Sequence, residues 1–435
     1  MTSPMLPVFF ESVPVGEILS RENGPAFRYR EDWTGLQGAF PVSLSMPINR
    51  AESGAEQVIP WLMNLLPEGE PLRAMSRALG IAAEDIVGMI MASGRDLAGA
   101  LSFQAPAEEP GYLPIDGSDA LERIINELPA RPFLAGEEGV AMSLAGAQDK
   151  LPVQLSDGVF SIPVNGAAST HILKPDNPRL PGSVQNEALC MVLARRCGLP
   201  VAEITTGMAG ARSFALVTRY DRRIESGKVR RLHQEDFCQA LGRGPAEKYQ
   251  HNQTGRQGPS LPDMFAVIRD HMTARDTNRF LDAVIFNIAI GNVDSHAKNY
   301  SILLHPDRTE LAPLYDLMSG LAWNGITENH AQDIGGQRRG RHVLGRHWRR
   351  MAEASGVSAT ATVRRVSAIS EKLLAELPAA RIEVAAMPAG EGVLLDEFVR
   401  HISERAELVA RNLQHGDESL STEEEPDTGA RYDTH

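Results

Sequence analysis

The sequence is poor in cysteine and has no long apolar run. Its three cysteines, Cys190, Cys197 and Cys238, form no Cys-x-x-Cys pair, which favours a reduced, intracellular protein. The first residues, MTSPMLPVFF, lack the basic segment of a secretory signal. The most apolar stretch, residues 280–290, is shorter than the ~20 residues that a bilayer span requires. These absences predict a soluble, cytoplasmic protein that has no membrane partner.

An excess of positive charge is also absent. The chain has 43 Lys and Arg residues against 56 Asp and Glu residues, a net charge of -13. This balance argues against nucleic acid binding over the whole surface, but it leaves room for a local basic patch. The 435 residues are 43% hydrophobic and 23% charged, which is typical of a globular protein of two or three domains.

The chain has no internal repeat, and its patterns divide it into five segments. The first segment contains strand-like runs such as 41–46 (PVSLSM), followed by helical periodicity in 71–80 and 84–93. The predicted segments are a compact unit at 1–103, a proline-rich linker at 104–119, a strand-rich lobe at 120–231, a helical lobe at 232–412 and a disordered acidic tail at 413–435.

Within the strand-rich lobe, local signals define several elements. The runs LPVQL and GVFSIP flank the turn Ser156-Asp157-Gly158, which predicts a β-hairpin. Residues 170–175 (THILKP) are predicted to form another strand. Residues 186–197 have a helical pattern that Gly198 closes.

A buried helix followed at once by polar residues indicates a functional loop. The helix-like segment 280–290 is apolar nearly all round, and Gly291 can cap it. The loop GNVDSHAKN follows, and then two strand-like runs, NYSILLH and LAPLY. If residues 300–304 pair antiparallel with 311–315, the start of one strand lies beside the end of the other. Asn299 and Asp316 are then expected to lie side by side.

This combination predicts magnesium-dependent phosphoryl transfer. One carboxylate, Asp294, would orient the acceptor hydroxyl, while an amide oxygen and a second carboxylate would hold magnesium on the nucleotide phosphates. The Asp-x4-Asn spacing alone is weak, because residues 282–287 also fit it. That copy lies inside the apolar helix and is interpreted as structural. The alternative for the second copy is a polar loop that only caps a helix.

The nucleotide-binding side is less distinctive. Lys174 lies in mid-strand, where a solvent-facing side chain is the favoured interpretation, although a kinase needs one lysine to neutralise phosphates. Glu187 on the following helix could orient that lysine. The loop MSLAGAQDK at 142–150 matches neither GxGxxG nor a Walker A motif, and alone it favours a plain loop. Its small residues would nevertheless let backbone amides approach phosphates, and Lys150 adds positive charge.

Six motifs in order resemble the HipA family of serine/threonine kinase toxins. These motifs are SLAGAQDKLPVQL, THILKPD, TRYDRR, LHQEDFCQALG, NVDSHAKNYSILL and LYDLMS. The runs PVSLSMPINR, NLLPEGE and ASGRDLAGALSF resemble the first subdomain of that family, and the likeness covers roughly residues 10–410. The resemblance implies an α/β (α+β) fold: a kinase-like two-lobed fold with an added N-terminal subdomain and an all-helical C-terminal lobe.

The resemblance also assigns roles within a site for ATP and Mg2+. Asp294 would be the catalytic base, and Asn299 and Asp316 would bind magnesium. The remaining expected contacts of ATP are the phosphate-binding loop Ala145, Gly146, Ala147, Gln148, Asp149 and Lys150, the phosphate contact Lys174, the adenine-binding hinge Thr218, Arg219 and Tyr220, and the nucleotide-lining residues His296, Ala297, Lys298 and Tyr315. The hinge, TRYDRR, departs from the family, which often has an acidic residue and a phenylalanine before DRR.

The family further implies autophosphorylation, here at Ser143, and particular partners. A phosphoserine adds about -1.5 to -2 charges, so beside a phosphate-binding loop it would repel ATP, expel the loop and switch the enzyme off. By resemblance, the substrate is an aminoacyl-tRNA synthetase, bound alone or with tRNA. The expected partner is a HipB-like helix-turn-helix antitoxin, which would bring the chain to operator DNA.

A basic run stands out from the acidic average. Residues 338–350 (RRGRHVLGRHWRR) contain six arginines, two histidines and no acidic residue. This run is either a solvated surface segment or a patch that contacts nucleic acid. Trp348 would stack on a base or anchor a helix.

Two other functions compete with a protein kinase. A small-molecule phosphotransferase of the aminoglycoside type shares the Asp-x4-Asn loop, but the N-terminal unit and the SLAGAQDK loop favour the protein kinase. A catalytically inactive adaptor in a DNA-binding repressor complex is a different class. The intact set of Lys174, Asp294, Asn299 and Asp316 argues against such degeneration.

Overall fold

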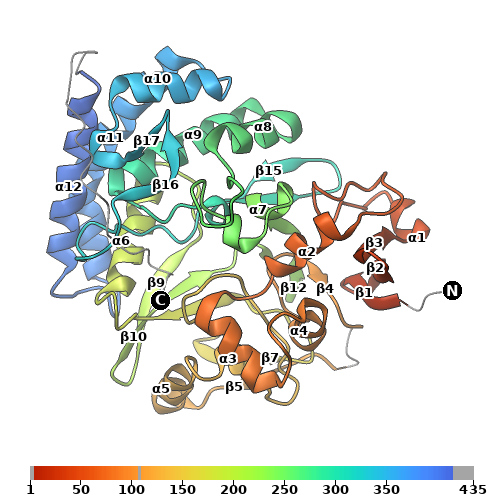
Figure 1. The fold of residues 1–435 in the computed structure, drawn as a ribbon. Helices are drawn as coiled ribbons and strands as arrows, with labels where there is room; N and C mark the ends of the chain where they lie inside the picture. Colours follow the sequence, from red (N-terminus) through yellow and green to blue (C-terminus); the bar gives the residue numbers. More distant parts are fainter. Residues whose placement is uncertain (1–3, 106–108, 415–435) are drawn as a thin grey trace.

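The computed structural model describes residues 4–105 and 109–414 (Figure 1). The N-terminal unit contains an antiparallel four-stranded sheet in the order β3-β2-β1-β4. Its elements are β1 (Pro4–Phe10), β2 (Val13–Arg21), β3 (Gly24–Tyr29), α1 (Glu31–Thr34), α2 (Ala55–Met63), α3 (Gly69–Leu79), α4 (Ile86–Ser93) and β4 (Leu101–Ser102). The helices predicted at 71–80 and 84–93 are confirmed as α3 and α4. The acidic tail, predicted at 413–435, lies outside the described residues from 415 onward.

The strand expected at 41–46 does not form. Its backbone groups bind side chains instead of a neighbouring strand. The amide N–H of Val42 donates to the Tyr29 hydroxyl at 2.8 Å, and that of Leu44 donates to Glu235 at 2.8 Å. The segment therefore connects the N-terminal unit to the rest of the chain, a role that its alternating pattern did not indicate.

An antiparallel six-stranded sheet forms the second part, in the order β5-β7-β6-β8-β10-β9. The strands are β5 (Gly111–Pro114), β6 (Leu151–Ser156), β7 (Val159–Val164), β8 (His171–Pro175), β9 (Ile204–Ala209) and β10 (Arg212–Thr218). The predicted hairpin is confirmed, since Ser156 pairs with Val159 across Asp157 and Gly158, both at positive φ. The linker interpretation of 104–119 is wrong for 111–114, which form the edge strand.

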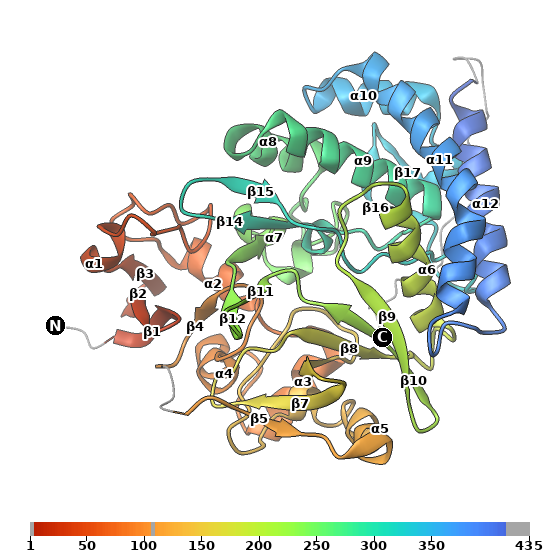
Figure 2. The ribbon, with the colours of Figure 1, turned by 180° about the vertical axis from the view of Figure 1, so that it is seen from behind.

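Two helices flank this sheet. α5 (Gly117–Glu127) lies at its lower edge in Figure 1, beside β9. A 3-10 turn at Pro132–Leu134 lies between α5 and β6 in the chain. α6 (Ser183–Arg196) confirms the helix predicted at 186–197 and packs between β9 and the C-terminal helices, as Figure 2 shows from behind. The short hairpin of β11 (Arg222–Glu225) and β12 (Lys228–Arg231) leaves the sheet after the hinge.

The C-terminal lobe is mainly, though not wholly, helical. Its helices are α7 (Phe237–Ala240), α8 (Leu261–His271), α9 (Ala274–Ile290), α10 (Gly345–Ala354), α11 (Ala359–Ala385) and α12 (Leu395–Asn412), with short 3-10 turns at Pro245–Glu247, Ala297–Asn299 and Gly340–His342. Short strands join them: β13 (Gln234–Asp236), β14 (Ser301–Leu304) and β15 (Thr309–Leu311) form one sheet, and β16 (Asn329–Ile334) pairs with β17 (Gln337–Arg339). Because these short strands lie between its helices, the lobe is not all-helical, in contrast to the prediction.

Helix α9 is the central element of this lobe. A capping box between Thr273 and Asp276 starts it, six residues before the predicted start, and Gly291 at φ 71° ends it. A side chain at Gly291 would also meet Leu321, with its Cβ 2.5 Å from that side chain. The helix is buried along residues 283–290, as its all-round apolar sequence predicts.

Two hydrophobic cores hold the molecule together, and they do not follow the predicted segment boundaries. One core joins α6 to the helices of the C-terminal lobe. The other joins the N-terminal unit to the six-stranded sheet, with Phe27 and Trp61 in the same cluster as Leu173 and Phe214. The N-terminal unit therefore packs as part of the sheet lobe.

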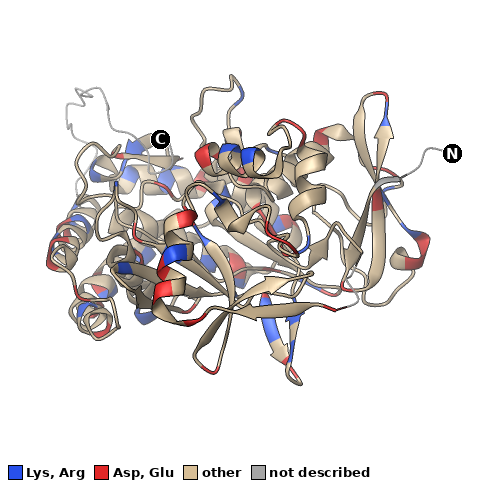
Figure 3. Cartoon of the chain, turned by 90° about the horizontal axis from the view of Figure 1, so that it is seen from below, with Lys and Arg blue, Asp and Glu red and all other residues tan. Residues whose placement is uncertain are grey.

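Lys and Arg are interspersed among Asp and Glu along the ribbon (Figure 3). In the described part of the chain, no helix combines the length and the apolar character that a bilayer span requires. The basic run 338–350 folds into β17, a 3-10 turn and α10. Trp348 is fully buried and anchors α10, so that its stacking on a base is excluded.

Candidate active site

A cavity of about 490 Å3 lies where the six-stranded sheet, the N-terminal unit and the C-terminal lobe meet. It brings together most of the residues that the sequence singles out. The predicted residues that line it are Ala145, Gly146, Ala147, Gln148, Asp149, Lys150, Lys174, Thr218, Arg219, Tyr220, Asp294, His296, Lys298, Asn299, Tyr315 and Asp316. Ala297 is an exception. It is buried in the helical core and does not line the cavity, and its N–H donates to Lys248 O at 3.1 Å, so its place beside the nucleotide stays a prediction.

Hydrogen bonds from Asn287, a residue of α9, hold the loop that follows this helix. Asn287 donates from Nδ2 to the Tyr300 hydroxyl at 2.8 Å and accepts from Asn292 Nδ2 at 2.9 Å. Asn292 Oδ1 in turn accepts from the Asp294 N–H at 3.1 Å. Asn287 belongs to the Asp-x4-Asn copy at residues 282–287, and neither it nor Asp282 lines the cavity. Asp282 pairs with Arg365 at 2.5 Å. The structural interpretation of that copy agrees with these contacts.

Two side chains bind Asp294 directly. The Tyr249 hydroxyl donates to Oδ1 of Asp294, and Asn299 Nδ2 donates to the backbone carbonyl of Asp294 at 2.8 Å. The second bond orients the Asn299 amide so that its oxygen is the atom left for a cation. Asp294 is therefore held in place by the loop that it belongs to and by Tyr249, which the sequence analysis did not identify.

The hairpin after this loop forms with a different register from the one expected. Ile302 pairs with Leu311 and Leu304 with Thr309, so that β15 covers 309–311 and not 311–315. After Leu311 the chain leaves the hairpin, because Leu314 bridges to Val201 beside β9. Asn299 and Asp316 still line the same cavity.

Lys174 is the centre of a buried ion triad. The strand pattern favours a solvent-facing side chain, whereas Lys174 is only 7% exposed. Its Nζ donates to Glu187 Oε1 at 2.6 Å and to Asp316 Oδ1 at 2.8 Å. The suggested contact with Glu187 is thus observed, and the lysine connects β8 and α6 to the end of the hairpin.

Contacts within the triad determine the protonation states of Lys174 and Asp316. Burial alone lowers the pKa of the Lys174 ammonium, but Asp316 and Glu187 outweigh burial and hold that pKa above its usual value. Burial raises the pKa of the Asp316 carboxyl, yet Lys174 and then Lys150 hold it below its usual value. Lys174 therefore stays cationic and Asp316 anionic, the states that phosphate and magnesium require. Asp316 also has φ 56°, a left-handed conformation that Asp and Asn tolerate better than most residues.

The segment 144–150 curls around its own lysine. Lys150 Nζ donates to Ala145 O at 2.6 Å, and a Cβ at Gly146 would lie 2.6 Å from that nitrogen. Gly146 has φ 109°, so this close approach needs glycine. Burial, followed by the charge of Lys174, lowers the pKa of Lys150 to about 8. The segment thus places small residues and a cation at the cavity, as the loop composition suggested.

Ser143 does not line the cavity. Its side chain is fully buried, its Oγ donates to Leu65 O at 3.0 Å, and its N–H donates to Asp96 O at 3.1 Å. Both acceptors belong to the N-terminal unit. The hydroxyl can therefore reach a nucleotide only if the segment leaves this position.

The predicted hinge has two of its three N–H donors engaged within the protein. The N–H of Thr218 donates to Glu203 O at 2.8 Å, and that of Arg219 to Thr170 O at 2.9 Å. These two N–H groups are therefore satisfied within the protein, while all three hinge residues line the cavity and their contact with adenine stays a prediction. Tyr220 lines the cavity, and its ring stacks on Tyr315 with centroids 5.7 Å apart.

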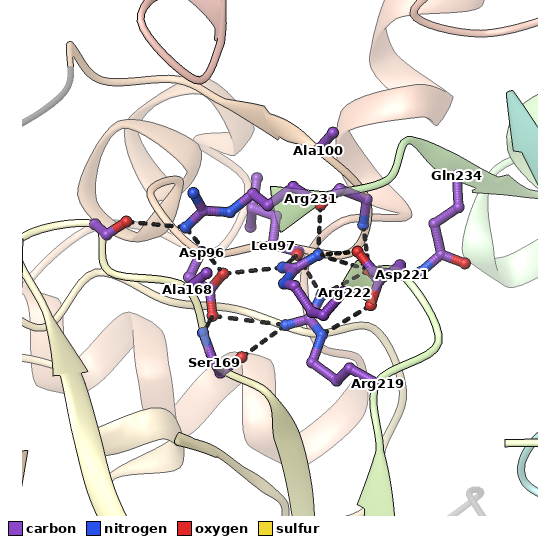
Figure 4. Close-up of polar contacts among 12 residues, drawn as sticks. Asp96, Leu97, Ala100, Ala168, Ser169, Arg219, Asp221, Arg222, Arg231 and Gln234 are labelled. Carbon is purple, nitrogen blue, oxygen red and sulfur yellow. Dashed lines mark hydrogen bonds and ion pairs between the residues drawn. The ribbon is translucent and has the colours of Figure 1, made fainter. Parts of the chain in front are cut away.

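The Arg219 side chain extends into a buried ion cluster beside the cavity (Figure 4). Arg219 Nη2 lies 2.8 Å from Asp221 Oδ2, and Arg222 Nη2 lies 2.9 Å from Asp96 Oδ1. Arg231 completes the cluster at 3.3 Å from Asp96. Burial raises the pKa of both carboxyls, but the arginines outweigh it and hold them ionised. The cluster fastens the hinge to residues 96–99 of the N-terminal unit.

A further residue at the cavity, Glu68, was not identified from the sequence. Its carboxylate pairs with Lys298 at 2.5 Å and with Lys248 at 2.7 Å. Burial raises the pKa of this carboxyl, but the two ammonium groups outweigh burial and hold the pKa well below its usual value. The only signal in the sequence was the run NLLPEGE, which contributed to the resemblance without any chemical role.

The residues at the cavity fit a magnesium nucleotide. The Asn299 amide oxygen and the Asp316 carboxylate are hard oxygen ligands of the kind that magnesium takes. Within residues 4–105 and 109–414, no group of three or more His, Cys, Asp or Glu side chains gathers as a metal site. Two protein ligands suit magnesium, since this ion keeps several waters and binds substrate phosphates. Lys174 and Lys150 supply cations for those phosphates.

Comparison with protein families gives two matches in sequence. Residues 6–104 match the HipA N-terminal domain, and residues 142–380 match the HipA-like C-terminal domain. Together they cover most of the chain, in the order that the motifs indicated.

Individual proteins are similar over most of the chain. A protein of Sinorhizobium fredii named "Putative kinase Y4mE" is 36% identical over 421 residues, covering 94% of this chain and 99% of its own. The serine/threonine-protein kinase toxin HipA of Shewanella oneidensis is 33% identical over 310 residues, covering 68% of this chain and 70% of its own. A solved HipA structure from Shewanella oneidensis, in complex with HipB and operator DNA, superposes with a TM-score of 0.82 at 26% identity, covering 92% of this chain and 96% of its own.

Proposed function

The chain belongs to the HipA family of kinases, and we propose that it is an ATP- and Mg2+-dependent serine/threonine protein kinase that acts as a toxin. The observation that carries this proposal is the Lys174–Asp316 ion pair, at 2.8 Å, in the same cavity as Asp294 and Asn299. A phosphate-binding cation, two magnesium ligands and a carboxylate base are the parts that phosphoryl transfer needs.

The mechanism assigns one task to each residue. Asp294 accepts the proton of the acceptor hydroxyl as that oxygen attacks the terminal phosphorus of ATP, and the bond from this phosphorus to the bridging oxygen breaks to release ADP. Tyr249 and Asn299 hold Asp294 in place. Lys174 and Lys150 bind the phosphates of the nucleotide, and Asn299 and Asp316 would hold magnesium. When bound, magnesium supplies charge neutralisation on the phosphate oxygens.

The proposed acceptor is a serine or threonine of an aminoacyl-tRNA synthetase, whose phosphorylation would inhibit translation and arrest growth. The proposed regulator is a HipB-like helix-turn-helix antitoxin that brings the chain to operator DNA. The similarity to the Shewanella toxin, whose solved structure contains HipB and operator DNA, supports this partner. The choice of a synthetase rests on the family alone.

A direct assay separates this function from its competitors. The purified chain is incubated with magnesium and labelled ATP, alone and with candidate synthetases, beside an Asp294→Asn variant. Label on Ser143 and on a synthetase is expected, and it should be absent from the variant. Turnover only with a small alcohol acceptor would indicate a phosphotransferase. The absence of any ATP turnover would indicate a catalytically inactive adaptor.

Autophosphorylation at Ser143 is proposed to inactivate the enzyme. Ser143 is fully buried, and its Oγ and N–H both donate to the N-terminal unit, so a phosphate there cannot fit without movement of the segment. A chain phosphorylated at Ser143 is therefore expected to lose ATP turnover, while Ser143→Ala keeps its activity over long incubations. Normal ATP turnover by the phosphorylated chain, measured after separation by charge, would refute this proposal.

The basic run 338–350 is proposed to contact nucleic acid, either tRNA on the substrate or operator DNA. Arg349 and Arg350 are exposed on α10, whereas Arg339 is buried and Arg341 pairs with Glu328 at 3.0 Å. The paired variant Arg349→Ala/Arg350→Ala is expected to weaken binding of labelled tRNA or operator DNA and to reduce its salt dependence. Unchanged binding, or binding that is indifferent to salt, would contradict this role.

A further inference from the structure

Glu68 reaches the cavity from the N-terminal unit, between α2 and α3. Its carboxylate lies between two ammonium groups, those of Lys298 and Lys248, at 2.5 Å and 2.7 Å. The side chain of Glu68 is 15% exposed, and those of the two lysines are 3% and 7% exposed. A carboxylate this well enclosed and paired at both oxygens has a defined position.

The backbone around Glu68 holds the phosphate-binding segment. The N–H of Glu68 donates to Gly146 O at 3.1 Å, next to a parallel bridge between Pro67 and Gly146. Three residues earlier, Leu65 O accepts the hydroxyl of Ser143 at 3.0 Å. Residues 65–68 therefore contact both Ser143 and Gly146, at the start of the segment that curls around Lys150.

The two lysines connect Glu68 to the catalytic loop. Lys298 precedes the candidate magnesium ligand Asn299 in the chain. Lys248 O accepts the N–H of Ala297 at 3.1 Å, and the next residue, Tyr249, donates its hydroxyl to Asp294. The Glu68 carboxylate thus holds two lysines, one of which precedes Asn299 and the other of which precedes Tyr249, the residue that binds Asp294.

The positions of Lys298 and Lys248 depend on the negative charge of Glu68. Without its carboxylate, two enclosed ammonium groups would face each other with their shared counter-charge removed. Leaving an enclosed charge without its partner is strongly unfavourable, so the lysines would separate or take up water. Either response would move residues 248–249 and 298–299 together.

We propose that Glu68 is a positioning residue that couples the phosphate-binding segment to the catalytic loop. The N-terminal unit thereby completes the active site through Glu68 N–H, which closes the segment at Gly146, and through the Glu68 carboxylate, which fixes Lys298 and Lys248. This inference rests on the proposed kinase function. It assigns the N-terminal unit a part in catalysis, in addition to its packing against the sheet.

The test compares Glu68→Gln with Glu52→Gln in the full-length chain. Glu52 forms a two-point ion pair with Arg21 in the same N-terminal unit, at 2.6 Å and 3.0 Å, and it does not line the cavity. Glu68→Gln is expected to lower kcat at least about tenfold, because it removes the carboxylate that two enclosed ammonium groups share. It should also accelerate amide hydrogen exchange in residues 142–150 without nucleotide. Glu52→Gln should leave both measurements as in the wild type.

Two further variants keep the inference open to refutation. Glu68→Asp retains the charge with a shorter reach, and it should recover part of the kcat that Glu68→Gln loses. Lys298→Met combined with Glu68→Gln should lose less activity than the two single losses multiplied together, because the two residues share one ion pair while Glu68 also holds Lys248. Additive losses, or wild-type kcat and exchange in Glu68→Gln, would overturn the coupling. An inactive wild type would instead count against the kinase function, while the exchange measurement would still test Glu68.

Discussion

One buried ion cluster surrounds Lys174 in β8 and another surrounds Arg219 just after β10, and they differ in how far their carboxylates are open to the cavity. In the Lys174 triad, the side chain of Asp316 is 35% exposed toward the cavity. In the arginine cluster, the side chains of Asp96 and Asp221 are each 3% exposed, and arginines and backbone N–H groups surround them (Figure 4). Both clusters place carboxylates against cations in the interior.

The difference identifies which cluster can bind a ligand. A carboxylate with every oxygen enclosed by protein can only hold the fold together, whereas one with an open side can exchange a lysine contact for a metal ion. The arginine cluster therefore supports the hinge, and the triad is the part that can react. Charge and burial alone would not separate them, since both are rich in ionised groups.

The largest effect should come from removing the open carboxylate. Asp316→Asn is expected to lower kinase turnover by about three orders of magnitude, because one of the two proposed magnesium ligands loses its charge. Asn tolerates the left-handed backbone at this position, and Lys174 keeps Glu187, so the free energy of unfolding should change by less than about 1 kcal/mol. ATP turnover and denaturant unfolding of the same sample measure the two quantities. A large loss of stability, or turnover within tenfold of the wild type, would remove the distinction between the clusters.

The enclosed cluster should show the opposite behaviour. Asp96→Asn leaves the arginines without their shared carboxylate, and it is expected to lower the free energy of unfolding by about 3–5 kcal/mol. Activity per folded molecule should fall less than about tenfold, because Asp96 does not line the cavity. Asp32→Asn, which changes an exposed pair with Arg30, serves as the matched control and should unfold like the wild type. If Asp96→Asn unfolds like that control, the cluster does not stabilise the hinge.

A smaller effect concerns pH. Burial raises the pKa of Glu235 to about 8, from a usual value of 4.5. Between these values the folded chain keeps a proton that the unfolded chain releases, so stability should fall as pH rises. Glu235→Gln cannot ionise, and its stability relative to the wild type should improve by about 3–4 kcal/mol from about pH 5 to pH 8. Parallel pH profiles of the two proteins would show that Glu235 is already ionised in the fold.

Local patterns in the sequence predicted the reactive elements well. The apolar helix, its glycine cap and the polar loop after it gave α9 and the position of Asp294. Asp316 reaches the predicted cavity although the register of the hairpin differs, because the chain leaves the hairpin after Leu311 and Leu314 bridges to Val201. Strand, turn and helix signals of this kind act over a few residues, which sequence reasoning can follow.

Contacts between distant parts of the chain could not be predicted in the same way. Glu68 meets Lys298 across 230 positions, and Asp96 meets Arg222 across 126. Lys174 also shows the problem, since strand alternation does not reveal that α6 and the hairpin cover its face of the sheet. The segment 41–46 alternates like a strand, yet its N–H groups bind Tyr29 and Glu235. In each case the deciding partner lies on another element.

The core shared by the N-terminal unit and the six-stranded sheet limits how this protein can be divided or recombined. A chain cut near residue 105 would expose the apolar faces around Phe27 and Trp61 on one fragment and those around Leu173 and Phe214 on the other. Neither fragment should fold or stay in solution without the other, and mixing them should restore both. For the same reason, the N-terminal unit could not be transferred to an unrelated kinase as an independent module. The two regions matched as separate sequence domains would thus be retained together in evolution.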